Sequence, residues 1–515
     1  MNRIRINTLL LLLCIFLPGV AQDVSDGWNK NKTARLTKPV FVYNNWSAYD
    51  ELSDNIPLNE TLAMKELDHI ARLKKMGVQV DYYLMDAFWF DVNEGYRKWR
   101  SDCWPEGPKR WLDACKREGI KPGLWFSTNL LRIGGEANTM KVIPEWESSV
   151  AEDGITLCLF RGGYLHHLMQ TLQMYADMGI KMFKFDFAYF DAATPDAKCT
   201  MLPADIEEQN KNAFISAIKE FRYKNPDVLF IGYNGFGGDM ENTVTPFRKT
   251  VDLRWLEIFD TMYCGDPRLS DVPMMNFWRS QDLYSDHMTF QYLFNGVPVQ
   301  RIDNCAFMIG TTGTCYNRAL NAWKGMMILT MARGGWLNVC HGNIDLLSDD
   351  DACWMAKVQQ LYMKVQQYGN ISAFGSIPGK ALPYGYMASA EGGNLYTVVN
   401  ASQEKVKVTL PEATGTGRVL FTDSGFIPVL EKNIVELGPE QMVVVGYGKF
   451  STREYDLGIE KDIVIPATIQ KYVTTNYPDA KILKIERDKK DYEVKLSNRT
   501  ELKFDLKFNL IDIDF

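Results

Sequence analysis

Residues 178–191, MGIKMFKFDFAYFD, form a hydrophobic run that carries a lysine and an aspartate. If this run is a β-strand, Lys184 and Asp186 project from the same face, because successive side chains of a strand alternate. The three phenylalanines of the run then cover the other face. A strand with this division of side chains is typical of a barrel interior or a cleft.

The segment before this run, GGYLHHLMQTLQMYADMG, has the pattern of a helix. Its apolar residues recur at helical spacing, and it ends at Gly179 and a short turn. Helix, turn and buried strand form the repeat unit of an α/β barrel or an open α/β sheet. In both folds, polar residues at the C-terminal end of such a strand face the ligand site. Lys184 and Asp186 are therefore predicted site residues, with a purely structural ion pair between them as the alternative.

Seven further segments read as strands of the same kind. They are PVFVYNNW, VDYYLMDAFW, KPGLWFS, LFIGYNG, PMMNFWRS, PVQRIDNC and GGWLNVCHG. Helix-period stretches separate most of them, so the fold class predicted for residues 38–368 is α/β, a (β/α)8 TIM-type barrel. The segment from Asp239 to Asp271 is predicted to be a loop with short helices over the rim.

After Tyr368 the pattern changes to short alternating segments separated by Gly, Pro and Asn. This pattern predicts an antiparallel β-sandwich over residues 369–450. Residues 455–515 begin with one amphipathic helix, followed by strands that alternate lysine with apolar residues. They resemble the PepSY-like, β-lactamase-inhibitor-like domains, which implies a small α+β domain. Its alternating charges are expected to form a solvated sheet face.

Composition and the N-terminus indicate an exported protein with an uncharged or weakly charged ligand. The net charge of -7 and the lack of a basic stripe argue against nucleic-acid binding. Residues 1–21 read as a signal peptide, so the protein is expected to be secreted or periplasmic; a lipoprotein modified at Cys14 is the less favoured reading. No membrane span is expected in the mature chain. The histidines lack metal-ligand spacing, and no metal or other cofactor is predicted.

GLWFS at residues 123–127 and the helix that leads into KFD resemble the barrel of glycoside hydrolase family 36, the melibiase-type α-galactosidases. Family 27, which has a KYD strand, is related. In both families the aspartate of this strand is the catalytic nucleophile, so the resemblance implies that role for Asp186. The C-terminal β domain also matches the layout of these enzymes.

A retaining glycosidase needs a second carboxyl group, about 5–5.5 Å from the nucleophile, to protonate the leaving oxygen. Family 27 has an acid/base aspartate after a WR motif, and family 36 has one in WTSD. In NFWRSQDLYSDHM the corresponding residue is Asp282, although its spacing differs by one residue from each family. Asp286 is the rival candidate. The structural alternative for Asp282 is the N-cap of the following helix.

The same resemblance implies a set of substrate-binding residues: Asp86, Trp89, Trp125, Lys184, Asn234 and Arg279. For Trp125, packing in the core is the alternative to a place in the apolar wall of the site. Asp86 matches the first aspartate of the LDDGW-like strand, whose two aspartates hold hydroxyl groups of galactose, and Ala87 replaces the second. His341 and Asp345 are expected near the rim of the eighth strand.

The resulting prediction is an exported retaining glycoside hydrolase that releases terminal α-linked galactose from oligo- or polysaccharides. Because Ala87 replaces an aspartate, a related sugar such as β-L-arabinopyranose or α-N-acetylgalactosamine is an alternative substrate. A sugar-binding barrel that has lost catalysis is the alternative from a different functional class.

Overall fold

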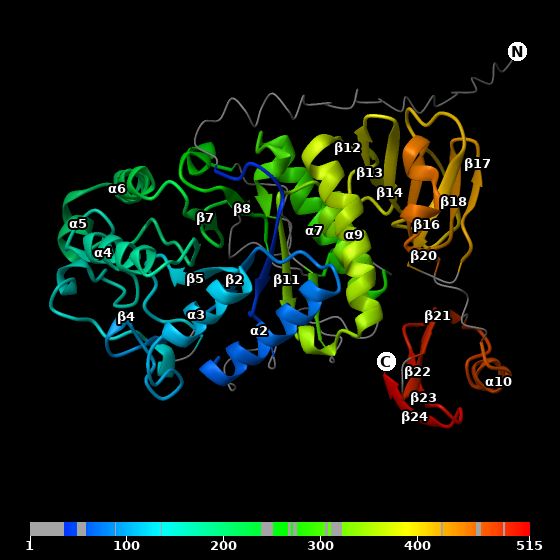
Figure 1. The fold of residues 1–515 in the computed structure, drawn as a ribbon, viewed down its shortest axis with the longest axis horizontal. Coiled ribbons are helices and arrows are strands. Elements are labelled where there is room, and N and C mark those ends of the chain that lie inside the picture. The colour runs from blue at the N-terminus through cyan, green and yellow to red at the C-terminus, as the bar shows by residue number, and fades with distance from the viewer. Residues whose placement is uncertain are drawn as a thin grey trace, which may run out of the picture.

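The structure is a computed structural model, and Figure 1 shows a barrel, an antiparallel β region beside it and a small C-terminal unit. It describes residues 35–48, 58–87, 89–134, 136–237, 251–265, 269–270, 275–303, 307–310, 322–423, 426–459, 465–480, 482–487 and 490–514. The predicted signal peptide, residues 1–21, lies outside the described residues.

A closed barrel of parallel strands forms the largest part of the molecule. The strands follow the order β1-β2-β5-β6-β7-β8-β9-β11, and β1 pairs with β11, which closes the sheet. Strand β10 also pairs with β11, so β9 and β10 share one position in the barrel. The predicted TIM-type barrel is therefore confirmed.

The barrel strands are β1 (Val40–Asn44), β2 (Tyr82–Met85), β5 (Lys121–Ser127), β6 (Met182–Asp186), β7 (Leu229–Gly232), β8 (Thr261–Tyr263), β9 (Ile302–Asp303), β10 (Phe307–Ile309) and β11 (Leu337–Gly342). A short ribbon, β3 (Phe90–Asp91) and β4 (Gly95–Trp99), follows β2. The described α-helices of the barrel are α2 (Glu60–Lys75), α3 (Lys109–Glu118), α4 (Tyr164–Asp177), α5 (Pro195–Thr200), α6 (Pro203–Lys224), α7 (Phe277–Phe294), α8 (Ala322–Ala332) and α9 (Asp349–Tyr368).

The sixth barrel strand differs from the prediction. The end of PMMNFWRS, predicted as this strand, opens helix α7 instead, and Asn276 caps that helix by accepting a hydrogen bond from the backbone N–H of Arg279 at 2.9 Å. The sixth strand is β8, which pairs with β7 and β9 and lies inside the segment predicted as a loop. With only the residues TMY, β8 is too short to show a two-residue period, so periodicity does not reveal it.

Strand β6 has the two faces that the sequence predicts. Phe183 and Phe185 contact Phe221 and Phe214 of helix α6, at ring-centroid distances of 6.0 and 5.3 Å. Because these two side chains point outward to the helix, the side chains that alternate with them face the barrel interior. All five residues of β6 are buried.

Two sheets follow the barrel, one with the order β12-β13-β14-β19-β16-β20 and the other β15-β18-β17. Their pairings are antiparallel except for β16 with β20. Buried side chains from both sheets, among them Tyr396, Val398, Val435 and Val445, form one hydrophobic cluster, so the sheets pack face to face. The strands are β12 (Asn370–Gly375), β13 (Tyr384–Ala390), β14 (Gly393–Val399), β15 (Val406–Thr409), β16 (Gly417–Thr422), β17 (Val429–Glu431), β18 (Ile434–Leu437), β19 (Met442–Tyr447) and β20 (Gly458–Ile459).

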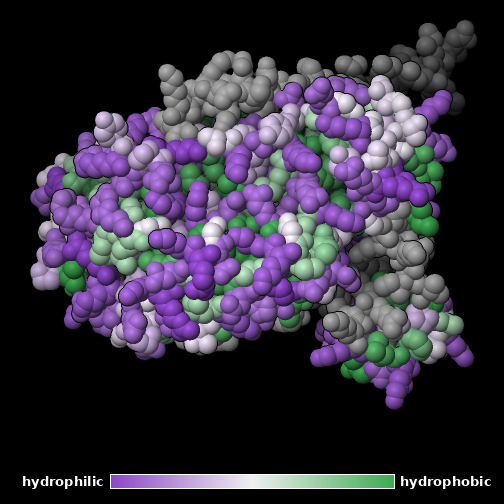
Figure 2. Space-filling model, in the orientation of Figure 1, coloured by the Kyte–Doolittle hydropathy of each residue, from purple (hydrophilic) through white to green (hydrophobic). Residues whose placement is uncertain are grey.

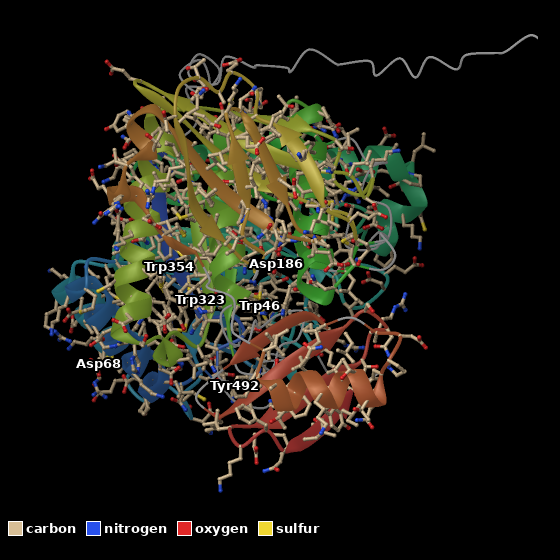
Figure 3. All side chains as sticks on the ribbon, turned by 90° about the vertical axis from the view of Figure 1, so that its right-hand side faces the viewer. Trp46, Asp68, Asp186, Trp323, Trp354 and Tyr492 are labelled. Atoms are coloured by element: carbon tan, nitrogen blue, oxygen red, sulfur yellow. The ribbon has the colours of Figure 1, made fainter. Side chains whose placement is uncertain are left out.

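Aromatic side chains join the barrel helices to the β region. Trp323 of α8 contacts Trp354 of α9 edge-on, with ring centroids 5.4 Å apart (Figure 3). Trp354 contacts Phe421 of β16, and its indole N–H donates to the carbonyl of Leu457 at 2.7 Å. The two regions therefore share one packed interface.

The C-terminal unit contains helix α10 (Ala467–Asn476) and an antiparallel sheet of β21 (Ile482–Arg487), β22 (Asp491–Leu496), β23 (Glu501–Asp505) and β24 (Leu510–Asp514). Ile469 of the helix packs with Val494 and Phe504 of the sheet in a core of its own. On the other face of the sheet, Lys503 pairs with Glu493 across strands at 3.1 Å. The alternating charges therefore neutralise one another across neighbouring strands.

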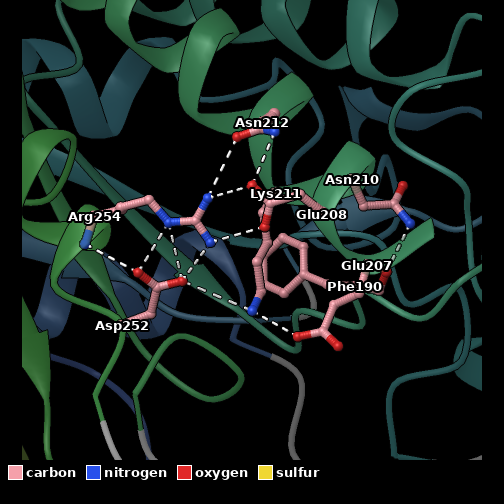
Figure 4. A network of polar contacts seen from close by, with 8 residues as sticks. All are labelled: Phe190, Glu207, Glu208, Asn210, Lys211, Asn212, Asp252 and Arg254. Atoms are coloured by element: carbon pink, nitrogen blue, oxygen red, sulfur yellow. Dashed lines mark hydrogen bonds and ion pairs between the residues drawn. The ribbon is translucent and has the colours of Figure 1, made fainter. Parts of the chain in front are cut away.

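A network of charged side chains holds the segment around Asp252 and Arg254 against helix α6. Arg254 donates to Asp252 at 2.8 Å and to Glu208 of α6 at 2.6 Å (Figure 4). Beside this network, the buried amide of Asn210 donates to the carbonyl of Phe190 at 2.7 Å. The ion pairs are partly exposed, so they orient the segment more than they stabilise the fold.

Hydrophilic residues predominate on the face of the molecule shown in Figure 2, and hydrophobic residues are scattered among them. This distribution is ordinary for a globular protein. Within the described ranges, no helix combines the length and the apolar character that crossing a membrane requires.

Glu66 is a carboxylic acid buried between helix α2 and the barrel. Its side chain accepts hydrogen bonds from the hydroxyl groups of Tyr43, at 3.1 Å, and Tyr83. Burial raises the pKa of Glu66 from 4.5 to about 8, although the hydrogen bond from Tyr43 lowers it. Glu66 is therefore protonated in the folded protein at neutral pH.

We expect Glu66→Gln to flatten the dependence of stability on pH. Between pH 4.5 and about 8 the folded state holds a proton that the unfolded state has released, so the free energy of unfolding falls as pH rises. Glutamine can accept from one tyrosine hydroxyl and donate to the other, as the protonated acid can, but it does not titrate. The variant should therefore lose roughly 3 kcal/mol of this pH dependence. Unfolding midpoints at pH 5, 6, 7 and 8 measure it. Parallel curves for the two proteins would contradict the assignment.

Candidate active site

Polar side chains from several barrel strands converge at the C-terminal ends of those strands. Asp86 follows β2, Lys184 and Asp186 end β6, and Asn234 follows β7. Trp125 of β5 and Asn234 donate hydrogen bonds to Asp186, and Lys184 donates to Asp86 beside them. In a TIM-type barrel the ligand site lies at this end of the strands.

The carboxylate of Asp186 has two unequal oxygens. Oδ1 accepts three hydrogen bonds, from the side-chain amide of Asn234 at 3.0 Å and from the backbone N–H groups of Asn234 at 3.2 Å and Phe187 at 2.9 Å. Oδ2 accepts one hydrogen bond, from the indole N–H of Trp125 at 3.1 Å. Among the residues that the structure describes, Oδ2 therefore keeps a lone pair that no other donor uses.

Two opposing effects set the pKa of Asp186. Burial raises it above its usual value, while the charge of Lys184 and the hydrogen bonds from Trp125 and Asn234 lower it. The direct ionic partner of Lys184 is Asp86, at 2.8 Å between Nζ and Oδ2. The alternative of an ion pair between Lys184 and Asp186 is therefore wrong, and Lys184 acts on Asp186 through its charge.

Two tyrosines and a further carboxyl group support Lys184. Its Nζ lies 4.0 Å from the ring centroid of Tyr233, and Tyr263 stacks on Tyr233 with centroids 4.1 Å apart. The hydroxyl of Tyr233 donates to Oδ2 of Asp303 at 2.8 Å. The pKa of Asp303 is raised to about 7. Burial is the cause of this rise, and the hydrogen bond from Tyr233 and the charge of Lys184 act in the opposite direction.

Sequence reasoning missed Tyr233 and Asp303 as parts of this group. Tyr233 directly follows β7, and Asp303 ends β9. The register places Tyr263 of β8 between them, so the three residues lie in one row across neighbouring strands. The available signal was a polar residue at the end of a predicted strand in LFIGYNG and in PVQRIDNC. Only the closure of the barrel brings the two side chains together.

Trp89 lies in an aromatic core and not among the polar group. Its ring is fully buried and contacts Trp99 and Tyr175, at centroid distances of 4.7 and 5.4 Å. Its indole N–H donates to the backbone carbonyl of Trp125 at 3.1 Å. These contacts support the strand that carries Trp125, and they do not support the predicted role of Trp89 in holding substrate.

Arg279 and Asp282 lie on helix α7 and form a separate cluster with the β region. The guanidinium of Arg279 donates to Asp282 at 2.9 Å, to the carbonyl of Glu440 at 2.9 Å and to the carboxylate of Asp423. None of the contacts between described residues joins this cluster to Asp186. The helix begins at Phe277, so the N-cap alternative for Asp282 is wrong.

Asp286, the rival proton donor, belongs to a buried ion pair within the barrel that the β region covers. Its carboxylate lies 2.6 Å from the guanidinium of Arg333, and both side chains are fully buried. The hydroxyl groups of Tyr384 and Tyr386, both on β13, also donate to it. This arrangement gives Asp286 a structural role.

Asp345, expected near the rim of the eighth strand, pairs with Lys65 of helix α2 at 3.1 Å. His341 does lie at that rim, where the ring centroid of Trp46 is 5.4 Å away. Among the described residues, no group of three or more His, Cys, Asp or Glu side chains is placed to hold a metal ion.

Solved structures with the same fold include several α-galactosidases. A GH36 α-galactosidase from Geobacillus stearothermophilus in complex with 1-deoxygalactonojirimycin matches with a TM-score of 0.54 and 15% identity, over 80% of this chain and 56% of that one. An α-galactosidase from Lactobacillus brevis matches with a TM-score of 0.57 and 14% identity, over 83% and 58%. A Bacteroides fragilis protein, provisionally described as an α-galactosidase, matches with a TM-score of 0.50 and 14% identity, over 80% of each chain.

These matches agree with the resemblance to family 36, and at such low identity they establish a common fold. The chain spans little more than half the length of the first two proteins, 56% and 58%. Residues 453–512 match the PepSY-like, beta-lactamase-inhibitor-like family model. A sequence search of curated proteins found no match.

Proposed function

We propose that this protein is an exported retaining glycoside hydrolase that releases terminal α-linked galactose. The observation that carries the proposal is the carboxylate of Asp186, held at the end of the fourth barrel strand by Trp125 and Asn234 beside the Lys184–Asp86 pair. A buried carboxylate with one oxygen anchored and the other less occupied suits a nucleophile.

The proposed mechanism is a double displacement. Oδ2 of Asp186 attacks the anomeric carbon while the bond to the leaving oxygen breaks, and a second carboxyl group gives that oxygen a proton. The same group, now a carboxylate, then takes a proton from water, which displaces Asp186 and restores the original configuration. Lys184 favours the ionised nucleophile through its positive charge.

Galactose is supported as the sugar by the similar structures. One of the matched proteins is an α-galactosidase in complex with 1-deoxygalactonojirimycin. Asp86 stands at the end of β2, and its Oδ1 accepts the backbone N–H of Ala87 at 2.9 Å while Oδ2 pairs with Lys184. Asp86 and Lys184 would together bind adjacent hydroxyl groups of the sugar.

We expect hydrolysis of p-nitrophenyl α-D-galactopyranoside to give α-galactose first, because two inversions restore the starting configuration. Proton NMR of the anomeric signals during the first minutes measures the product before mutarotation. β-Galactose as the first product would contradict the two-step mechanism. Failure to cleave α-galactosides while an aryl β-L-arabinopyranoside or α-N-acetylgalactosaminide is cleaved would change the assigned sugar.

The resemblance and the structure give different expectations for Asp282→Asn. A proton donor typically contributes about 10²–10⁴-fold to the rate. Because Asp282 pairs with the buried guanidinium of Arg279, we expect the variant to lose less than about tenfold in kcat and to melt at a lower temperature. A larger loss that grows with the basicity of the leaving group, and that azide rescues for activated substrates, would establish Asp282 as the donor.

A further inference from the structure

The end of β11 beside the end of β1 carries two polar side chains that the proposed mechanism does not use. Tyr43 pairs with Cys340 in the register of these strands, so the next residues, Asn44 and His341, lie side by side. The hydroxyl of Tyr43 contacts Glu66 of the surrounding helix α2, so Tyr43 points outward. Asn44 and His341 therefore face the barrel interior.

His341 is a neutral hydrogen-bond acceptor in this position. Its Nδ1 lies 3.2 Å from the carbonyl oxygen of Asn44, and because a carbonyl only accepts, Nδ1 carries the proton. Burial lowers the pKa of His341 to about 3, and the charges of Lys184 and Asp86 also act on it. Nε2 is therefore unprotonated at neutral pH, on a ring that lies within electrostatic range of Lys184 and Asp86.

Asn44 supplies the complementary donor. Its Oδ1 accepts the backbone N–H of Trp46 at 3.0 Å, which fixes the orientation of the amide. Its Nδ2 is fully buried and has no hydrogen-bond partner among the described residues. A buried amide without a partner costs free energy, which a ligand can recover.

We propose that Asn44 and His341 together bind one hydroxyl group of the sugar whose anomeric carbon faces Asp186. A hydroxyl group accepts a hydrogen bond and donates one, so it satisfies Nδ2 of Asn44 and Nε2 of His341 at once. The pair then selects against sugars that lack this hydroxyl, because both buried groups would be left unpaired. The inference rests on the proposed function and extends it to sugar specificity.

The test compares His341→Phe and Asn44→Leu with the unmodified protein on p-nitrophenyl α-D-galactopyranoside and its 2-, 3-, 4- and 6-deoxy analogues. In the unmodified protein, we expect the loss of one particular hydroxyl group to lower kcat/KM strongly. In either variant, the loss of the same hydroxyl group should lower kcat/KM by a factor that is about 10- to 100-fold smaller. Comparing each analogue between proteins cancels its intrinsic reactivity. His166→Phe, on the exposed surface of α4, is the matched control and should keep the selectivity of the unmodified protein.

A purely structural role for the pair would lower kcat/KM for every substrate by the same factor, and this result would overturn the inference while the proposed function stands. If the protein turns over none of these substrates, the proposed function fails, and calorimetric binding of D-galactose and its deoxy forms then tests the pair. Equal losses of affinity for all sugars in the variants, or no binding by the unmodified protein, would overturn the inference.

Discussion

Replacing Asp186 with asparagine is expected to lower kcat for p-nitrophenyl α-D-galactopyranoside by on the order of 10⁴-fold or more. The amide is nearly the same size as the carboxylate, but it cannot form the covalent glycosyl ester. Its oxygen can keep the hydrogen bonds that Oδ1 accepts from Asn234 and Phe187, and only the bond from Trp125 to Oδ2 is lost. The fold and the binding of galactose should therefore persist, and initial-rate measurements together with a melting curve separate the two properties.

The matched control for this variant is Asp68→Asn. Asp68 is exposed on helix α2, and Figure 3 shows it away from Asp186. Its replacement should leave kcat unchanged. With Asp186→Gly, azide should restore turnover of an activated substrate and give the β-galactosyl azide, because azide attacks from the side of the missing carboxylate. Turnover by Asp186→Asn within tenfold of the unmodified protein would remove Asp186 as the nucleophile.

Replacing Asp286 with alanine is expected to destabilise the protein by about 3–5 kcal/mol. The change removes the carboxylate that faces the fully buried guanidinium of Arg333, and it also removes the acceptor of the hydroxyl groups of Tyr384 and Tyr386. Because this cluster joins helices α7 and α8 to strand β13, the loss should appear as a lower unfolding temperature of the barrel and the β region together.

The double variant Asp286→Leu with Arg333→Met is the control for this prediction. Replacing a whole buried ion pair with apolar side chains of similar size is often close to neutral, so the part of the loss that comes from the uncompensated charge of Arg333 should return. The hydroxyl groups of Tyr384 and Tyr386 still lack their acceptor, so the recovery should be incomplete. Thermal unfolding followed by circular dichroism and by calorimetry measures both variants. A single variant that melts at the temperature of the unmodified protein would show that water reaches Arg333 and compensates its charge.

Arg279, Asp282 and Asp286 show how a motif match can assign chemistry to residues that serve an interface. The WR motif and the aspartates after it occur in the sequence, with Asp282 one residue away from the spacing of either family. Helix α7, however, turns this face toward Asp423 and Tyr384 of the β region. A sequence motif shows only residues that are close along the chain, whereas Asp423 lies 144 residues from Arg279 and Tyr384 lies 98 residues from Asp286.

The sequence by itself determined the barrel, the change to antiparallel sheets after Tyr368 and the position of Asp186 at a strand end. These features follow from local patterns: a two-residue period in strands, a helical period between them, and a charged pair within the apolar run MFKFDF. Each pattern spans fewer than about 20 residues and needs no knowledge of the partner strands.

Tertiary structure alone decided the sixth strand and the partners of the site residues. Strand β8 has three residues, and it is a strand only because β7 and β9 pair with it. Lys184 pairs with Asp86, which lies 98 residues earlier in the chain, and not with Asp186 two residues away. The physical reason is that side chains two apart on a strand run parallel, while closure of the barrel turns side chains of distant strands toward one another.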